Sequence, residues 1–437
     1  MPEITAEDEV VRLCQELIRI DSSNYGDGSG PGEAEAARYV VEQLREVGLE
    51  PRTFEAAPRR VSVAVRIPGA DRDRPGLCLH GHLDVVPAEA ADWQVDPFSG
   101  ELRDGCVWGR GAVDMRGMDA MILALVRENA RAGVLPPRDL VVVFFADEEA
   151  GGEHGSQFMA QEHPEVFAGV SEAVSEVGGY SVTVPTPEGG RARAYLLQTA
   201  EKGIAWLTLR ARGTAGHGSV PNDDNPIAHL AGAVARIADH EWPGQHIDSV
   251  RDLLAGLSRL TGIPVEDVEG LLATIPGAAG FVRGTLRDTS NPTVLSGGYK
   301  HNVVPQTATA AIDCRFLPGH EDDVMATIRE LAGPHVEVEV HHRDIALETD
   351  LEGPLVEAMI AAIGAEDPGA TVLPYCLSGG TDNKALATLG ITGYGFAPLR
   401  LPEDLPFAPM FHGIDERVPV DALTFGVKVL RRLVATS

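Results

Sequence analysis

Hydrophobic residues in the first half of the chain form short continuous runs, separated by segments with helical spacing. The run DLVVVFFADEE at 139–149 is almost wholly apolar at first, which is typical of a strand covered on both faces. VSVAVRIPG at 61–69 and GLCLHGHLDVVP at 76–87 predict two more strands. Apolar residues recur at helical spacing in three other segments, 6–20, 33–47 and 117–133. Strands alternating with helices predict an α/β fold with a mostly parallel sheet.

The pattern changes at GIAWLTLRARG, residues 203–213, where apolar and polar positions alternate. Such alternation is typical of a half-exposed antiparallel strand. The elements predicted next are helices at 226–240 and 248–260, strands at 293–300 and 308–316, a helix at 321–332 and a strand at 335–342. This β-α-β-β-α-β order predicts a small ferredoxin-like α+β domain inserted at 201–346. Residues 1–200 and 347–437 then form one discontinuous domain.

A large excess of acidic residues narrows the choice of partners. The 437 residues hold 36 Lys and Arg against 65 Asp and Glu, a formal net charge of −29. This charge argues against nucleic acid or an anionic membrane as the main partner. The start, MPEITAEDEVVRLCQELIRID, lacks the basic flank and apolar core of a signal peptide, and no apolar run reaches ~18 residues. Five scattered cysteines favour reduced thiols in a cytoplasmic protein.

Polar side chains follow the predicted strands where a parallel sheet binds ligands, beyond the carboxyl ends of its strands. His82 and Asp84 form H-x-D within 76–87, where the apolar strand runs into polar residues, and Glu148 and Glu149 end the run at 139–149. The remaining candidates are Asp114 in GRGAVDMRG, Glu176 in SEVGG and His412 in FHGIDERVPV. One such residue alone is more often a structural hydrogen-bond partner. Several at successive strand ends favour a common site.

A pair of zinc ions accounts for these residue types. Zinc binds imidazole nitrogen and carboxylate oxygen, and a catalytic site leaves a position for water. Two ions that share one carboxylate and one water lower the pKa of that water and polarise the carbonyl under attack. Their charge also explains how so many carboxylates stay ionised together. Cobalt and manganese suit the same ligands.

The motifs resemble those of one family of two-zinc enzymes. HGHLDVVP, WGRGAVDMRG, FFADEEAGG, SEVGG, GHGSVP and HGIDERVPV match in order and spacing, over nearly the whole chain. The family comprises aminoacylases, carnosinase-like dipeptidases, carboxypeptidase G and succinyl-diaminopimelate desuccinylase. The resemblance implies a catalytic domain with an inserted lid. It also implies hydrolysis of an amide bond next to a free carboxylate, in an N-acyl amino acid or a small peptide.

The resemblance also implies the metal ligands. His82 and Glu176 hold one zinc, Glu149 and His412 hold the other, and Asp114 bridges them. Glu172 competes with Glu176, but Glu176 directly precedes VGG, as the family's ligand precedes glycines. The motif EVGG departs slightly from the commoner EGGG.

The same resemblance implies roles for residues near these ligands. Asp84 orients the imidazole of His82. Glu148 is the general base, which takes a proton from the metal-bridging water and passes it to the leaving nitrogen. A cis peptide bond joins Asp114 to Met115.

Substrate contacts are expected from the inserted domain and from a glycine-rich loop. The resemblance implies that His217 in GHGSVP stabilises the oxyanion, and that Asn302 in HNVVP and Arg315 in DCRFLPG hold the substrate carboxylate. Arg315 has an alternative reading, a surface ion pair on a strand. In SGGTDNKAL, Gly379 and Gly380 let the backbone approach the ligand.

By the same resemblance, the protein is expected to be a homodimer in which His217 reaches the active site of the partner. The strand at 203–213 is the expected edge through which two sheets pair.

Two other functions fit part of the pattern. One is a non-catalytic, metal-dependent binding protein on the same fold, but such a protein needs no base in the place of Glu148. The other is a two-metal phosphoesterase, because metal pairs serve that chemistry too. The sequence shows no basic cluster around the motifs that would favour it.

Overall fold

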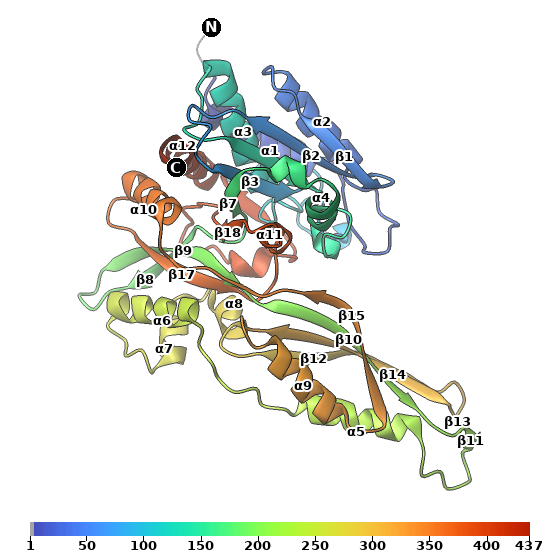
Figure 1. Cartoon of the computed structure of the whole chain (residues 1–437). Helices are drawn as coiled ribbons and strands as arrows, with labels where there is room; N and C mark the ends of the chain where they lie inside the picture. Colours follow the sequence, from blue (N-terminus) through green and yellow to red (C-terminus); the bar gives the residue numbers. More distant parts are fainter. Residues whose placement is uncertain (1–3) are drawn as a thin grey trace.

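The computed structural model describes residues 4–437, and its largest element is a ten-stranded sheet (Figure 1). The strands are β1 (Arg52–Ala57), β2 (Arg60–Ile67), β3 (Gly76–His82), β6 (Leu140–Phe145), β7 (Val170–Ser175), β8 (Tyr180–Pro185), β9 (Arg191–Glu201), β16 (Leu347–Glu348), β17 (Thr371–Leu377) and β18 (Thr392–Gly395). They follow the order β1-β2-β6-β3-β7-β18-β9-β16, and both β8 and β17 pair with β9.

The centre of this sheet is parallel. Strand β3 pairs in parallel with β6 and β7, and β7 pairs in parallel with β18, whereas β1 and β2 are antiparallel additions at one side. Every residue of β3 and β6 is buried, as expected for strands covered on both faces. The predicted α/β fold with a parallel central sheet is confirmed.

Helices cover both faces of the large sheet. On one face lie α1 (Ala6–Ile18), α2 (Ala34–Arg45), α3 (Arg116–Ala132), α10 (Pro354–Glu366) and α12 (Val420–Thr436). On the other lie α4 (Ser156–Glu162) and α11 (Asn383–Ala387). Alternate residues of β6 divide between these layers, with Val142 and Phe144 in the first and Val143 and Phe145 in the second. The carboxyl ends of β3, β6 and β7 therefore remain at the rim of the layers.

A second sheet is antiparallel and carries its own apolar core. Its strands are β10 (Gly203–Arg212), β12 (Thr289–Gly297), β14 (Thr307–Phe316) and β15 (Val336–Asp344), in the order β12-β14-β10-β15. Helices α5 (Pro226–Ala238) and α9 (Glu321–Ala332) pack on one face. Strand β14 alternates strictly between buried and half-buried residues. This small sheet has the ferredoxin-like strand order.

The prediction that the strand at 203–213 is the sheet edge is wrong. Strand β10 pairs with β14 on one side and β15 on the other, so the edges of the small sheet are β12 and β15. Alternation of apolar and polar residues indicates that one face of a strand is covered. It does not indicate which strands lie on either side of it.

Three helices inside the predicted insertion pack on the large sheet instead. They are α6 (Asp248–Thr261), α7 (Val268–Ala273) and α8 (Ala279–Gly284), and α6 and α8 contact β17. Their buried residues, such as Leu253 and Leu257, belong to the core of the large sheet. The domain limits at 201 and 346 stay a prediction.

Short elements complete the chain. They are the strands β4 (Glu101–Arg103), β5 (Cys106–Trp108), β11 (Gly216–His217), β13 (Val303–Val304) and β19 (Arg417–Pro419), and the 3₁₀ turns η1 (Ala90–Asp92), η2 (Glu148–Ala150), η3 (Pro164–Phe167) and η4 (Ala408–Met410). From residue 4 to residue 437, no helix is both long and apolar enough to cross a membrane.

Candidate metal centre

The fold brings polar side chains together at the carboxyl ends of three adjacent parallel strands. His82 is the last residue of β3, and Glu176 directly follows β7. Glu148 and Glu149 lie in η2, just beyond β6, which pairs with β3. Because these strand ends meet at one rim, side chains from distant parts of the sequence become neighbours.

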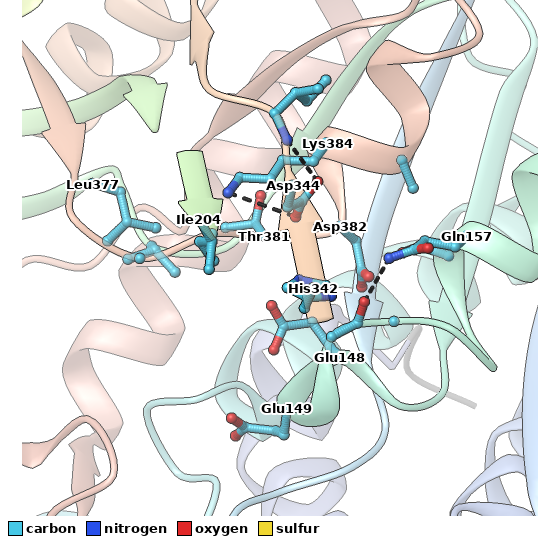
Figure 2. Close-up of a pocket in the computed structure, with 18 of the residues that line it drawn as sticks. Glu148, Glu149, Gln157, Ile204, His342, Asp344, Leu377, Thr381, Asp382 and Lys384 are labelled. Carbon is cyan, nitrogen blue, oxygen red and sulfur yellow. Dashed lines mark hydrogen bonds and ion pairs between the residues drawn. The ribbon is translucent and has the colours of Figure 1, made fainter. Parts of the chain in front are cut away.

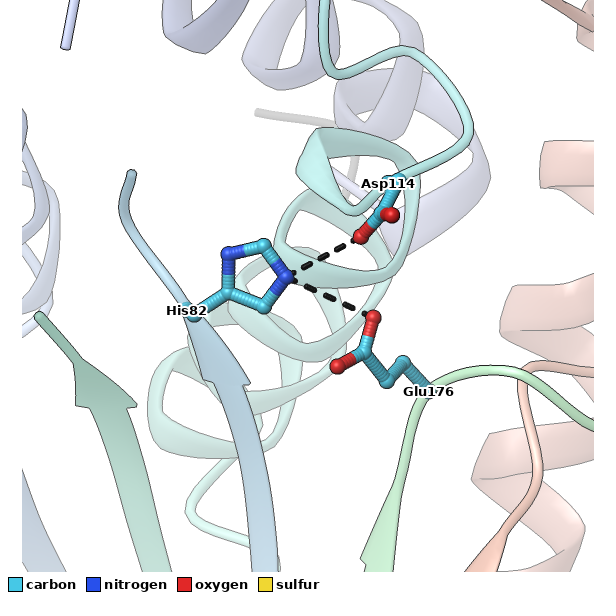
Figure 3. Close-up of side chains that lie close together, drawn as sticks. All are labelled: His82, Asp114 and Glu176. Atoms are coloured by element: carbon cyan, nitrogen blue, oxygen red, sulfur yellow. Dashed lines mark hydrogen bonds and ion pairs between the residues drawn. The ribbon is translucent and has the colours of Figure 1, made fainter. Parts of the chain in front are cut away.

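One group of possible ligands forms around the imidazole of His82 (Figure 3). Its Nε2 lies 3.0 Å from Oδ1 of Asp114 and 3.4 Å from Oε2 of Glu176. The ligand atoms of these three residues lie within 4.8 Å of one another. His82 is fully buried, and Asp114 and Glu176 are nearly so.

A second group shares Asp114 with the first. Nε2 of His412 lies 3.3 Å from Oδ2 of Asp114 and 3.0 Å from Oε2 of Glu149. The ligand atoms of Asp114, Glu149 and His412 also lie within 4.8 Å of one another. Asp114 therefore turns one carboxylate oxygen toward each group.

The charges of these residues fit a pair of cations. Burial raises the pKa of Glu176 and of Glu148, and the charge of Glu176 raises that of Glu148 further. Burial also raises the pKa of Glu149, whose Oε1 is buried without a hydrogen-bond partner. Hydrogen bonds to Asp114 and Glu149 raise the pKa of His412 to about 10. Two metal ions would offset this concentration of negative charge and use the unpaired oxygen.

Asp84 makes contacts beyond the predicted one with His82. Its carboxylate oxygens accept the backbone N–H groups of Glu148 at 3.1 Å and of Glu149 at 3.0 Å. The Nδ1 of His82 lies closer to the backbone oxygen of Asp84, at 3.1 Å, than to its carboxylate, at 3.5 Å. Asp84 thus holds the η2 turn as well as contacting the imidazole. The predicted cis peptide bond between Asp114 and Met115 is confirmed.

A cavity of about 830 Å³ opens beside these groups, between η2 and the strands β10, β14 and β15 of the small sheet (Figure 2). Glu148 and Glu149 line it together with Arg315, Gly379 and Gly380. The guanidinium of Arg315 forms a two-point ion pair with Asp313, at 2.6 and 3.0 Å. Arg315 is therefore paired on its strand and also lines the cavity, and its contact with a substrate carboxylate stays a prediction.

Two predicted substrate residues are not brought to this cavity. His217 lies in β11 and Asn302 directly precedes β13, and these short strands pair at the far end of the small sheet (Figure 1). His217 is exposed, and its Nδ1 lies 2.8 Å from Oγ of Ser219. Glu172, the competitor of Glu176, pairs with Arg138 away from the ligand groups.

The sequence prediction missed several residues that line the cavity. His342 in β15 packs on Trp206 of β10, with ring centroids 4.8 Å apart, and Phe281 comes from α8. No short motif marks these three. Asp382 and Lys384 also line the cavity, and the SGGTDNKAL loop was a signal that could have identified them.

Residues 78–436 match the model of peptidase family M20/M25/M40. The chain belongs to this family. The resemblance read from the motifs is confirmed, and the protein is an enzyme, a hydrolase of the metallopeptidase and aminoacylase type that acts on amide bonds.

Individual members of the family match over most of their length. The chain is 28% identical to the N-fatty-acyl-amino acid synthase/hydrolase PM20D1 of Xenopus tropicalis, over 85% of this chain and 74% of that protein. It is 26% identical to aminoacylase-1 of Pongo abelii, over 92% and 90%. The solved structure of the metallo-carboxypeptidase Sso-CP2 from Sulfolobus solfataricus has the same fold, with a TM-score of 0.74 at 18% identity, over 98% and 99%.

Proposed function

We propose that the protein hydrolyses an amide bond next to a free carboxylate, in an N-acyl amino acid or a small peptide, with two bound zinc ions. One observation carries the proposal. Two ligand groups share Asp114, and Glu148 lies beside them in the wall of the cavity. Hydrolysis needs a metal site and a proton-transfer group in one accessible place, and this arrangement supplies both.

The residues divide into ligands and a base. His82 and Glu176 would hold one zinc ion, Glu149 and His412 the other, and Asp114 both. When bound, such a pair polarises the carbonyl and lowers the pKa of water. Glu148 belongs to neither ligand group, and its Oε2 lies 3.9 Å from Nε2 of His82. Its carboxylate is therefore available to take a proton from the attacking water and give it to the leaving nitrogen.

The cavity wall supports recognition of a carboxylate next to an apolar group. Arg315 supplies a guanidinium whose fork suits a carboxylate. Gly379 and Gly380 present backbone that a ligand can approach closely. The apolar part of the wall includes Ile204, Trp206, Phe281, Leu377 and Phe411. An acyl chain or an apolar side chain would bury its surface there.

The names of three similar proteins support this proposal. One is named for N-fatty-acyl-amino acids, one is an aminoacylase, and one is a metallo-carboxypeptidase. The first two names describe an amide beside an amino-acid carboxylate, and the third describes metal-dependent cleavage at a free carboxyl end. Zinc suits the imidazole and carboxylate ligands, and cobalt or manganese would suit them too.

We also propose that the protein works as a cytoplasmic homodimer. The edge strand β12 carries Val294 and Leu295, which are 59% and 65% exposed. Pairing of two such edges would cover them and extend the small sheet. His217 and Asn302, which lie away from the cavity of their own chain, would then serve the partner's active site, with His217 as the oxyanion donor.

A substrate screen tests the proposed reaction. The purified protein, stripped of metal and reloaded with Zn²⁺, Co²⁺ or Mn²⁺, is assayed on N-acyl amino acids, dipeptides and a phosphodiester. We expect metal-dependent cleavage of one of the first two classes. Metal binding without any turnover would favour a binding protein, and phosphodiester cleavage alone would favour a phosphoesterase.

A further inference from the structure

Glu416 occupies an unusual position behind the metal centre. Its side chain is fully buried, and both carboxylate oxygens accept hydrogen bonds from one loop. Oε1 accepts the backbone N–H groups of Val113, at 2.6 Å, and Asp114, at 3.0 Å. Oε2 accepts the backbone N–H of Gly111 and the guanidinium of Arg110, each at 2.9 Å. Four donors therefore converge on one carboxylate.

The main chain around Glu416 reinforces this contact. The backbone N–H of Gly109 donates to the backbone oxygen of Glu416 at 2.9 Å. The next residues form β19, which pairs with β5 immediately before the loop. The loop at 109–114 is thus held at its start by strand pairing and along its length by one side chain.

The same segment also carries a predicted ligand. His412 precedes Glu416 by one short turn, and the carboxylate of Asp114 lies 3.3 Å from the imidazole of His412. His412 is 57% exposed at its side chain and Asp114 only 10%. Asp114 and His412 are two of the three members of the second ligand group and come from distant parts of the chain. Glu416, four residues after His412, directly contacts the backbone of Asp114.

We propose that Glu416 is a positioning residue of the metal centre, which fixes the loop at 109–114 so that Asp114 turns one oxygen toward each ligand group. The inference rests on the proposed function, because it assumes that Asp114 binds two metal ions. A carboxylate suits this task because all four groups that it meets are donors. Charge-assisted hydrogen bonds of this kind are stronger than neutral ones, so they restrain the orientation of the Asp114 carboxylate.

Metal affinity tests the inference separately from activity. Full-length Glu416→Gln, stripped of metal, is titrated with Zn²⁺ in competition with a chromophoric chelator. Glutamine has the same shape as glutamate, but an NH₂ group replaces one of the two carboxylate oxygens. This NH₂ group would face N–H donors of the loop, which need an acceptor. We expect Zn²⁺ to bind about 10- to 100-fold more weakly, as for other groups that orient metal ligands.

A matched control separates positioning from general stability. Asp288 is also a buried carboxylate that accepts a backbone N–H, from Leu317 at 2.7 Å, but it lies in the small sheet region. Asp288→Asn should lower the unfolding temperature and leave the Zn²⁺ affinity unchanged. If Glu416→Gln does not fold, Glu416→Asp, which keeps the charge but is one methylene shorter, decides by the same criterion.

The outcomes are distinct. Two Zn²⁺ ions bound by the wild type and weakened binding by the Glu416 variant would support the inference. Unchanged affinity in a folded Glu416 variant would overturn it and leave the proposed function standing. A wild-type chain that binds no Zn²⁺ would overturn the proposed function itself.

Discussion

Oδ1 of Asp84 accepts the backbone N–H of Glu148 over 3.1 Å, so the turn that presents the proposed base is tied to the strand end that presents His82. Oδ2 of the same carboxylate accepts the N–H of Glu149 at 3.0 Å and an amide N–H of Asn24 at 2.8 Å. One buried side chain thus sets the relative position of a proposed base and a proposed ligand.

Replacing this carboxylate should damage the site without unfolding the protein. Asp84→Asn keeps one acceptor oxygen but turns an NH₂ group toward one of the two N–H donors. We expect turnover to fall about 10- to 100-fold, measured as kcat on the best substrate of the screen. Asp139→Asn is the control, because Asp139 accepts the N–H of Gly69 away from the site. Equal losses in both variants would contradict a special role for Asp84.

Glu148→Gln should separate metal binding from chemistry. Glu148 belongs to neither ligand group, so the variant should retain both metal ions. Loss of a general base typically lowers the rate about 100- to 10,000-fold. Metal analysis and a rate assay on the same sample check this. The control is Glu153→Gln, the same change at an exposed carboxylate of the same loop. A near wild-type rate would show that Glu148 is not the base.

Arg315→Ala should raise KM for substrates with a free carboxylate and matter much less for the same substrates as amides. The guanidinium can form two parallel hydrogen bonds with a carboxylate but loses that pairing with an amide. Arg210→Ala is a matched control, because Arg210 makes a similar two-point pair with Glu339 in the same sheet but does not line the cavity. Equal KM changes for acid and amide would assign Arg315 a structural role.

Mixing two inactive variants should restore activity if His217 acts across a dimer interface. His217→Ala and Glu148→Gln are each expected to be nearly inactive alone. After subunit exchange, one site in each heterodimer has both a wild-type base and a wild-type partner histidine. The mixture should therefore regain turnover, and mass measurement should show a dimer. A monomeric protein, or a mixture that stays inactive after demonstrated exchange, would refute the proposal.

Lys202 should give the unfolding free energy a distinct dependence on pH. Its ammonium is fully buried and donates to the backbone oxygens of Gly284 and Arg287, and burial lowers its pKa to about 8. Between this value and the ordinary pKa of about 10.4, the unfolded chain holds a proton that the native chain lacks. The stability of the wild type relative to Lys202→Met should therefore rise with pH across that window. Urea unfolding of both proteins at pH values from 7 upward measures this difference in stability. If the free energy of unfolding of the two proteins changes with pH in the same way, the lowered pKa of Lys202 is contradicted.

Some features of the fold follow from local chemistry alone. The β-branched run in β6 is buried on both faces because each of its side chains is apolar, and no other placement avoids exposing them to water. The polar residues after β3, β6 and β7 must lie at one rim once these strands are parallel neighbours. The family motifs then identify the same residues that the structure brings together around Asp114.

Other features depend on contacts between distant segments, which no local pattern specifies. The alternation in β10 predicts a strand but not its place in the middle of the small sheet. Helices α6 and α8 lie inside the predicted insertion yet cover β17, because their apolar faces find their partner on the large sheet. Neither the place of β10 in its sheet nor the packing partner of α6 and α8 can be predicted from residue spacing or composition.

The sequence by itself determined the α/β class, the family and the residues proposed as ligands and base, because apolar runs and short motifs are local. Only the tertiary structure decided how those residues are held. Asp84 supports the turn of Glu148, and Glu416 supports the loop of Asp114, through hydrogen bonds between segments far apart in the chain. His217 and Asn302 are set apart from the cavity in the same way, by the path of the small sheet. Such relations follow from the packing of whole elements, and that packing depends on all of their contacts at once.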